Sequence, residues 1–218
     1  MFNRSNTNRL FGRTRGRSKK KINLKNYYDL VEKYKFKKCN QELDYILDIG
    51  TGYGETSIFL AKQFPDTVII SCEKYIDGNI ILIKNIEKNN IHNIRLHDGN
   101  VYNILEITNK KYFRLVWIFF PDPWPKNRHS KRRLITYDFL IKLHKILKDN
   151  SEIYIATDSV IYVRFILNSI YKCKDYFLWV NQSEINLSIK DYFDIETKYY
   201  KKAINSQRKP SLFILRKL

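Results

Sequence analysis

An aspartate and a tryptophan stand between prolines at positions 121–125, Pro-Asp-Pro-Trp-Pro, directly after an apolar run. Proline fixes φ and removes a backbone donor, so this segment can hold the Asp122 carboxylate and the Trp124 ring in one rigid geometry at the end of a buried strand. A basic cluster follows at once, made of Lys126, Arg128, Lys131, Arg132 and Arg133. An acid and a ring beside such a cluster indicate a nucleobase pocket with a rim that grips phosphates. The alternative is a proline-ended strand followed by a solvated run of charge.

Carboxylates also stand at the ends of three earlier apolar runs, at Asp48, Glu73 and Asp98. The carboxyl ends of parallel strands form one crevice, so these acids are expected to meet there. Glu73 stands where an acid accepts hydrogen bonds from ribose hydroxyls in doubly wound folds, and Asp98 suits the exocyclic amine of adenine. A single acid after a strand is often only a helix cap, but three acids in register favour an adenosine site.

The first of these runs leads into a glycine turn, Gly50-Thr51-Gly52-Tyr53-Gly54, and then into a helix pattern. Strand, glycine turn and helix form a nucleotide-type cradle, although one such turn does not identify the ligand. In a dinucleotide fingerprint a small residue would stand at position 55, close to the pyrophosphate. Glu55 is bulky and anionic, whereas S-adenosylmethionine carries no phosphate and bears a cationic sulfonium. The sequence therefore favours S-adenosylmethionine over a nicotinamide dinucleotide.

Alternating strand and helix patterns place these residues in an α/β fold. Apolar runs predict five strands, at 43–49, 67–72, 93–97, 117–120 and 152–157. Helical periodicity predicts helices at 26–36, 56–64, 77–88, 134–147 and 159–171. Two last apolar runs, 176–180 and 212–215, predict antiparallel strands joined by a long loop. We therefore expect a mostly parallel seven-stranded sheet with helices on both faces and an antiparallel C-terminal hairpin.

The charge of the chain indicates a polyanionic partner. The 218 residues carry a formal net charge of +18, and the sequence pI is about 9.7. An aromatic-rich folded chain with this charge is expected to bind nucleic acid rather than a membrane surface, although part of the Lys excess could reflect a biased base composition. Residues 1–21 contain many cations and no acid, which predicts a basic, mobile arm, and residues 22–218 are expected to form a single domain.

The sequence offers no membrane or metal signal. No apolar run approaches the ~18 residues that span a bilayer, and the Arg-rich start does not resemble a signal peptide, so a cytoplasmic protein is expected. Cys39, Cys72 and Cys173 are too far apart for a zinc site or a disulfide framework. The four histidines show no metal-ligand spacing.

Taken together, these features resemble a Rossmann-like class I methyltransferase. The segment 119–133, FFPDPWPKNRHSKRR, is similar to the hallmark of the bacterial tRNA (guanine-N7-)-methyltransferase family. The resemblance extends along the chain through RLFGR at 9–13, DIGTGYGE at 48–55, HDG at 97–99, ATD at 156–158 and TKYY at 197–200. It implies methylation of the N7 atom of the variable-loop guanine of tRNA, with S-adenosylmethionine as donor, by a monomer or homodimer.

The resemblance also implies roles for individual residues. The methyl donor would contact Asp48, Gly50, Gly52, Glu73, Asp98 and Asp122, of which Asp122 would also be catalytic. The guanine or its tRNA would contact Lys126, Asp158, Thr197, Lys198, Tyr199 and Tyr200, and the RNA backbone would contact Arg128, Lys131, Arg132 and Arg133. The family usually has Glu where this chain has Tyr200, which supplies a hydroxyl but no charge.

The chemistry of guanine N7 fits this set of residues. The nitrogen carries an in-plane lone pair and no proton, so alignment matters more than base catalysis. Methylation leaves the purine cationic, and a preorganised carboxylate such as Asp122 would favour the developing charge. No metal is required. The alternatives are a methyltransferase for another RNA and a non-catalytic RNA-binding module on the same fold; the acids at the strand ends count against the second, because they repel RNA.

Overall fold

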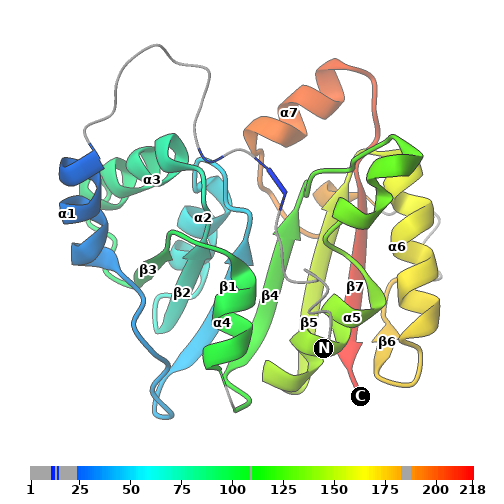
Figure 1. Ribbon diagram of the computed structural model, residues 1–218, viewed down its shortest axis with the longest axis horizontal. Helices are drawn as coiled ribbons and strands as arrows, with labels where there is room; N and C mark the ends of the chain where they lie inside the picture. The colour runs from blue at the N-terminus through cyan, green and yellow to red at the C-terminus, as the bar shows by residue number, and fades with distance from the viewer. Residues whose placement is uncertain (1–10, 13, 15–23, 109, 183–187) are drawn as a thin grey trace, which may run out of the picture.

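Within the part of the chain that the structure describes, seven strands form one sheet in the order β3-β2-β1-β4-β5-β7-β6 (Figure 1). The computed structural model describes residues 11, 12, 14, 24–108, 110–182 and 188–218. The strands are β1 (Asp44–Ile49), β2 (Thr67–Cys72), β3 (Ile94–His97), β4 (Phe113–Phe119), β5 (Leu147–Thr157), β6 (Phe177–Trp179) and β7 (Ser211–Lys217). Strands β1 to β5 pair in parallel, and β7 pairs antiparallel with both β5 and β6.

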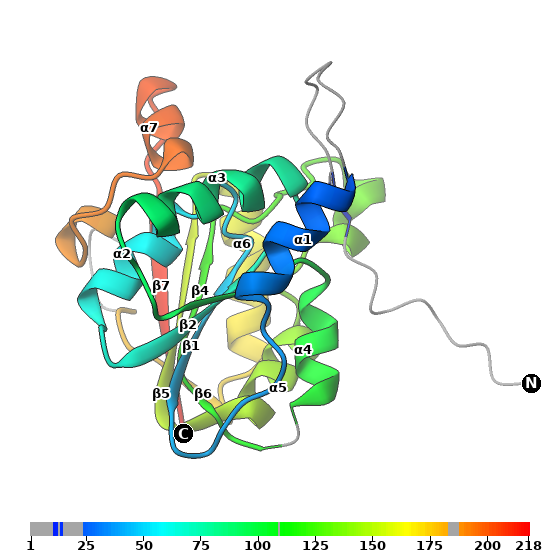
Figure 2. The same cartoon turned by 90° about the vertical axis from the view of Figure 1, so that its left-hand side faces the viewer.

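Helices cover both faces of the sheet (Figure 2). One face packs against α1 (Leu24–Tyr34), α2 (Glu55–Gln63), α3 (Ile76–Lys88) and α7 (Lys198–Asn205). The other face packs against α4 (Val101–Ile107), α5 (Tyr137–Ile146) and α6 (Val160–Lys172). Two short 3-10 helices, η1 (Asn127–Arg132) and η2 (Ile189–Asp191), lie in connecting segments. Each face therefore has its own apolar core, with the sheet between the two.

The central strands are apolar throughout because both of their faces are covered. All residues of β4 except Arg114 are buried. Trp117 lies in the middle of this strand, with its ring stacked on Phe119 at 4.5 Å and on Phe59 of α2 at 5.7 Å between centroids. This packing anchors the strand that leads into the Pro-Asp-Pro-Trp-Pro segment.

The predicted fold class is confirmed, but several elements differ from their predicted bounds. Strand β5 begins at Leu147 rather than at residue 152, and α5 begins at Tyr137 rather than at residue 134. Strand β4 begins at Phe113, earlier than expected, and α4 was not predicted because its seven residues are too few to show a clear period. The long loop predicted between the last two strands contains α7, which is polar except for a narrow face with the buried residues Tyr200 and Ala203. Most of the predicted N-terminal arm lies outside the described residues.

The described residues contain neither a candidate membrane span nor a candidate metal cluster. None of the helices within these ranges is both long and apolar enough to cross a membrane. In the same part of the chain, no three His, Cys, Asp or Glu side chains are grouped so that they could hold a metal ion.

Candidate methyltransferase site

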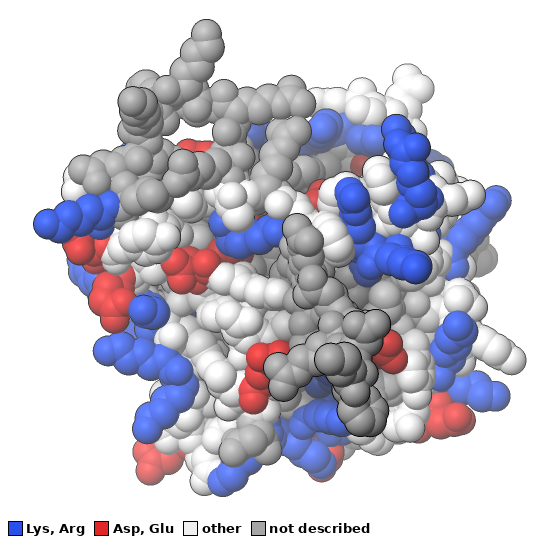
Figure 3. Space-filling model, viewed as in Figure 1, with Lys and Arg blue, Asp and Glu red and all other residues white. Residues whose placement is uncertain are grey.

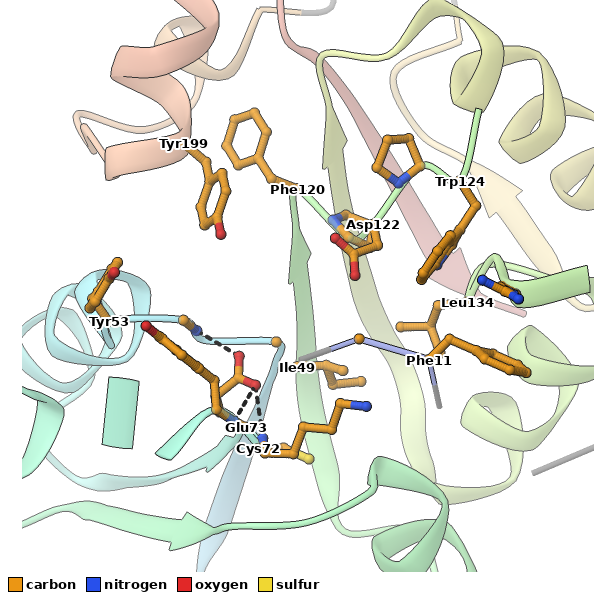
Figure 4. Close-up of a pocket in the computed structure, with 18 of the residues that line it drawn as sticks. Phe11, Ile49, Tyr53, Cys72, Glu73, Phe120, Asp122, Trp124, Leu134 and Tyr199 are labelled. Carbon is orange, nitrogen blue, oxygen red and sulfur yellow. Dashed lines mark hydrogen bonds between the residues drawn. The ribbon is translucent and has the colours of Figure 1, made fainter. Parts of the chain in front are cut away.

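A cavity of about 1050 Å³ opens at the carboxyl ends of β1, β2 and β4 (Figure 4). Its walls come from the glycine turn after β1, residues 72–75 after β2 and residues 120–125 after β4, with Tyr199 of α7 and Phe11 from the start of the chain. The strand order reverses here, since β1 is flanked by β2 on one side and by β4 on the other. Such a switch point is where open α/β sheets bind their ligands.

Glu73 faces the glycine turn from the end of β2. Its Oε2 atom accepts a hydrogen bond from the backbone N of Gly52 at 2.9 Å, and its Oε1 atom accepts from the backbone N of Lys74 and Tyr75 at 2.8 and 2.9 Å. Burial raises the pKa of Glu73, and the backbone hydrogen bonds oppose this shift. Each carboxylate oxygen offers two acceptor positions, so Oε2 keeps one position for a ligand.

Asp48 lies beneath the glycine turn rather than in the cavity wall. It is 1% exposed, and its Oδ2 atom accepts hydrogen bonds from Thr56 Oγ1 and Ser57 Oγ, both at 2.6 Å. These donors belong to the first turn of α2, so the carboxylate ties β1 to the start of that helix. Burial raises the pKa of Asp48 to about 6, against the two hydroxyl hydrogen bonds and with a smaller contribution from the charge of Glu73.

The loop after β4 has a strained backbone. Phe120 and Trp124, on either side of Pro-Asp-Pro, have φ values of 53° and 41°, a region that is costly for residues other than glycine. The buried Arg133 side chain compensates: its Nε donates to the carbonyl oxygen of Pro123 at 2.9 Å, and its Nη2 donates to that of Trp124 at 3.1 Å. The loop is thereby held so that Asp122 faces the cavity (Figure 4).

Aromatic rings lie on two sides of Asp122. Tyr199 of α7 stacks on Phe120, with 6.3 Å between ring centroids and an interplanar angle of 23°. On the other side, the Arg132 guanidinium lies 4.8 Å from the Trp124 ring centroid and 5.1 Å from that of Phe11. Flat aromatic and guanidinium surfaces are the groups on which nucleobases stack. The site therefore combines a carboxylate with stacking surfaces for a base.

Comparisons with known proteins agree with this geometry. A family model described as "Putative methyltransferase" matches residues 43–211. The tRNA (guanine-N(7)-)-methyltransferase of Wolbachia pipientis wMel is 31% identical over 85% of this chain and 84% of its own length. The enzyme of the same name from Neorickettsia sennetsu is 34% identical, over 74% of each chain. The chain belongs to the tRNA (guanine-N7-)-methyltransferase family.

Solved structures show the same fold at low sequence identity. A putative methyltransferase from Streptococcus mutans in complex with SAH has a TM-score of 0.52 and 12% identity, over 91% of this chain and 99% of its own. This likeness shows that the two chains share one fold.

The predicted donor residues fall into two groups. Four of them line the cavity: Gly50, Gly52, Glu73 and Asp122. Asp48 and Asp98 do not line it. Asp48 is covered by the glycine turn, and at the end of β3 the cavity wall is formed by Gly99, next to Asp98.

The predicted substrate residues are less closely grouped. Of these six, only Tyr199 lines the cavity, and Lys126 is exposed just beyond it. The Asp158 carboxylate forms an ion pair with Arg208 Nε at 3.0 Å. Thr197 is the N-cap of α7, and Lys198 is the first residue of that helix. Tyr200 packs in the apolar core at 9% exposure, which accounts for an aromatic residue in place of the usual Glu.

The predicted RNA-backbone residues also differ among themselves. Arg128 and Lys131 are exposed on η1, while Arg132 lines the cavity and contacts aromatic rings. Arg133 departs from the expectation: it is 7% exposed, and its guanidinium is occupied by the loop carbonyls and by the Phe165 ring at 4.9 Å. A run of charged residues in the sequence does not show which of their side chains will be buried.

Sequence reasoning missed several aromatic residues of the site. Tyr53 and Tyr75 line the cavity on the side of Glu73, with their rings 5.9 Å apart in an edge-to-face arrangement. Phe120 was taken only as the end of an apolar run. Single aromatic residues in loops have no spacing that distinguishes them. The one usable signal was that Tyr53 stands between two glycines of the predicted turn.

Proposed function

We propose that this protein transfers the methyl group of S-adenosylmethionine to the N7 atom of a guanine in tRNA. The observation that carries the proposal is the Asp122 carboxylate, held by a strained proline loop in the wall of the cavity, in a chain of this family. The cavity lies between stacking surfaces on one side and the glycine turn on the other. A donor and a base can therefore meet beside one carboxylate.

The residues of the cavity fit S-adenosylmethionine. Gly52 has φ 58° and donates its backbone N–H to Glu73, so the turn lies close to this acid without a side chain between them. The free acceptor position of Glu73 Oε2 suits a ribose hydroxyl. Glu73 and Asp122 give the cavity two carboxylates, and the buried Asp48 adds a third acid beneath the turn. Lys74 and Arg132 line the cavity as well, so its fit to the donor rests on the acceptor position of Glu73 and not on an excess of negative charge.

The bound donor supplies an electrophilic methyl group, and the residues of the chain align the base. Guanine N7 already carries its lone pair, so no residue has to remove a proton before attack. Stacking against Phe120 and Tyr199 would orient the purine plane, and alignment of this kind lowers the barrier. The purine becomes cationic as the bond forms, and Asp122 stabilises this charge because it is already in place.

The outer surface near the cavity suits the RNA backbone. Lys126, Arg128 and Lys131 are exposed after β4, and Lys201 and Lys202 are exposed on α7. Figure 3 shows Lys and Arg side chains over the upper right of the molecule, where η1 and α7 lie in Figure 1. With a net charge of +18, this rim would hold tRNA phosphates around the mouth of the cavity. tRNA is accordingly the proposed partner, and the cytoplasm is the proposed place of the reaction.

Nucleoside mapping tests the proposal. Unmodified tRNA is incubated with the protein and the methyl donor, digested, and examined by mass spectrometry for 7-methylguanosine. A matched transcript that contains 7-deazaguanosine serves as the control, because it has no N7 atom to accept the methyl group. We expect 7-methylguanosine only in the first sample. A different methylated nucleoside would favour the alternative of another RNA methyltransferase, and no methylation of any RNA would favour a binding module.

A further inference from the structure

The glycine turn and the start of α7 are joined by direct contacts, although they are far apart in the chain. The carboxylate Oε2 of Glu55 accepts a hydrogen bond from the backbone N of Lys198 at 2.8 Å, across 143 residues. The Lys198 Nζ atom lies 4.3 Å from the centroid of the Tyr53 ring. Glu55 is the first residue of α2, and Lys198 is the first residue of α7. One acidic side chain thus links the turn on the donor side of the cavity to the helix on the opposite side.

The Glu55 carboxylate supplies one further acceptor at the N-terminus of α7. The first backbone N–H groups of a helix have no partners within the helix, and Thr197 Oγ1 accepts only the one from Tyr200, at 3.1 Å. Glu55 accepts the N–H of Lys198, and its negative charge lies at the positive end of the helix dipole. An eight-residue helix is marginal by itself, so contacts of this kind determine where it lies.

Tyr199 is the residue whose place depends on this contact. It follows Lys198 directly, lines the cavity and stacks on Phe120. A Cβ atom placed on Gly52 would lie 3.8 Å from Tyr199 Cε2, so the ring lies next to the glycine turn, on the side where Gly52 has no side chain. Figure 4 shows its hydroxyl end directed from α7 into the cavity. The ring therefore lies between the donor turn and the loop that carries Asp122.

We infer that Glu55 is a positioning residue, which holds α7 so that the Tyr199 ring covers the reacting centre and connects the donor side to the base side. This inference rests on the proposed function and adds a residue that the sequence pattern did not assign to it. Glu55 was expected only to exclude a pyrophosphate. Its hydrogen bond with α7 gives the side chain a second role, because it helps to hold the helix that carries the cavity-lining Tyr199.

The experiment compares Glu55→Ala, which removes the acceptor, with Glu55→Gln, whose amide oxygen can still accept from Lys198 N. Glu32→Ala on α1, an exposed acid that pairs with Lys35, is the control for loss of charge. We expect Glu55→Ala to lower kcat on tRNA roughly tenfold, since small displacements of an aligning group are costly. Glu55→Gln and Glu32→Ala should stay within about twofold of wild type, and donor affinity should change little in all three.

A double-mutant cycle with Tyr199→Ala decides whether Glu55 acts through this ring. If it does, Glu55→Ala combined with Tyr199→Ala should be no slower than Tyr199→Ala alone. Two effects that multiply would overturn the inference, as would an unchanged kcat in Glu55→Ala. Hydrogen exchange of the α7 amides gives a readout independent of activity: exchange should be faster in Glu55→Ala and near normal in Glu55→Gln. If the wild type failed to methylate tRNA, the proposed function would fall, and the exchange data would still decide the role of Glu55.

Discussion

The side chain of Arg133, which does not line the cavity, donates a hydrogen bond at 2.9 Å to the carbonyl oxygen of Pro123, the residue after the cavity-lining Asp122. A second hydrogen bond, to the carbonyl oxygen of Trp124, fixes the same loop where its backbone is strained. A guanidinium is well suited to this task, since its planar fork donates to two acceptors at once. The loop that carries Asp122 is therefore stabilised by a cation that belongs, in the sequence, to the basic run of residues 126–133.

Removal of this clamp, the pair of hydrogen bonds from Arg133 to the loop carbonyl groups, should destabilise the protein. We expect Arg133→Met to lower the free energy of unfolding by about 2–4 kcal/mol, because two charge-assisted hydrogen bonds are lost and two carbonyl groups lose their partners. Urea denaturation followed by circular dichroism measures the change. Arg128→Met is the matched control, since Arg128 is exposed on η1 and should cost less than ~0.5 kcal/mol. Equal effects of the two substitutions would show that the clamp contributes nothing.

The Asp122 carboxylate should act mainly in the transition state. Asn has nearly the same shape but no charge, so Asp122→Asn should lower kcat by ~10²–10³ with little change in KM for tRNA or donor. Steady-state kinetics with a matched thermal melt provides the measurement. A rise in KM for the donor at constant kcat would instead assign Asp122 to donor binding. A fall in kcat of less than about threefold would remove it from the catalytic step.

The buried acid Asp48 should make stability depend on pH. Its pKa is about 6 in the folded protein, against 3.8 for an aspartate side chain in water, so between these values the folded state binds more protons than the unfolded state. The free energy of unfolding should therefore fall as the pH rises from about 4 to about 6, by on the order of 2–3 kcal/mol, and the loss persists above that range.

Comparison of Asp48→Asn with wild type isolates this effect, because Asn does not titrate. Urea unfolding at pH 4, 5, 6 and 7 should show the variant gaining stability relative to wild type as the pH rises. Glu73 contributes in the same direction in both proteins, since burial raises its pKa too. Asp66→Asn, at an exposed position, is the control. A difference that did not vary with pH would mean that the pKa of Asp48 is not raised.

Exposed cations of η1 should set the salt dependence of tRNA binding. Arg128→Ala and Lys131→Ala should each reduce the slope of log affinity against log salt by roughly 0.7–0.9 if each side chain neutralises one phosphate. Filter binding over a range of salt concentrations measures the slope. Lys145→Ala is the control: Lys145 is exposed in the last turn of α5, just before β5 begins, at the end of the sheet opposite the cavity. An unchanged slope would mark η1 as a solvated surface.

The sequence by itself determined the α/β fold, the crevice at the strand ends and the loop that carries Asp122. These features depend on local patterns. Apolar runs, glycine turns and prolines act within a few residues, so the elements that they specify can be predicted from their spacing in the sequence. The same patterns could not show α7, because only two buried residues mark its inner face. Its position follows from contacts with the rest of the fold.

Only the tertiary structure decided how the charged residues are used. Arg133 and Arg132 are neighbours in one basic run, yet one is buried beneath the loop and the other lines the cavity. Asp48 and Glu73 both stand at the ends of strands, yet only Glu73 reaches the cavity, because the glycine turn covers Asp48. The bond from Glu55 to Lys198 joins positions 143 residues apart. Whether a charge meets water, a carbonyl group or a ligand depends on what packs around it, and spacing along the chain does not record this.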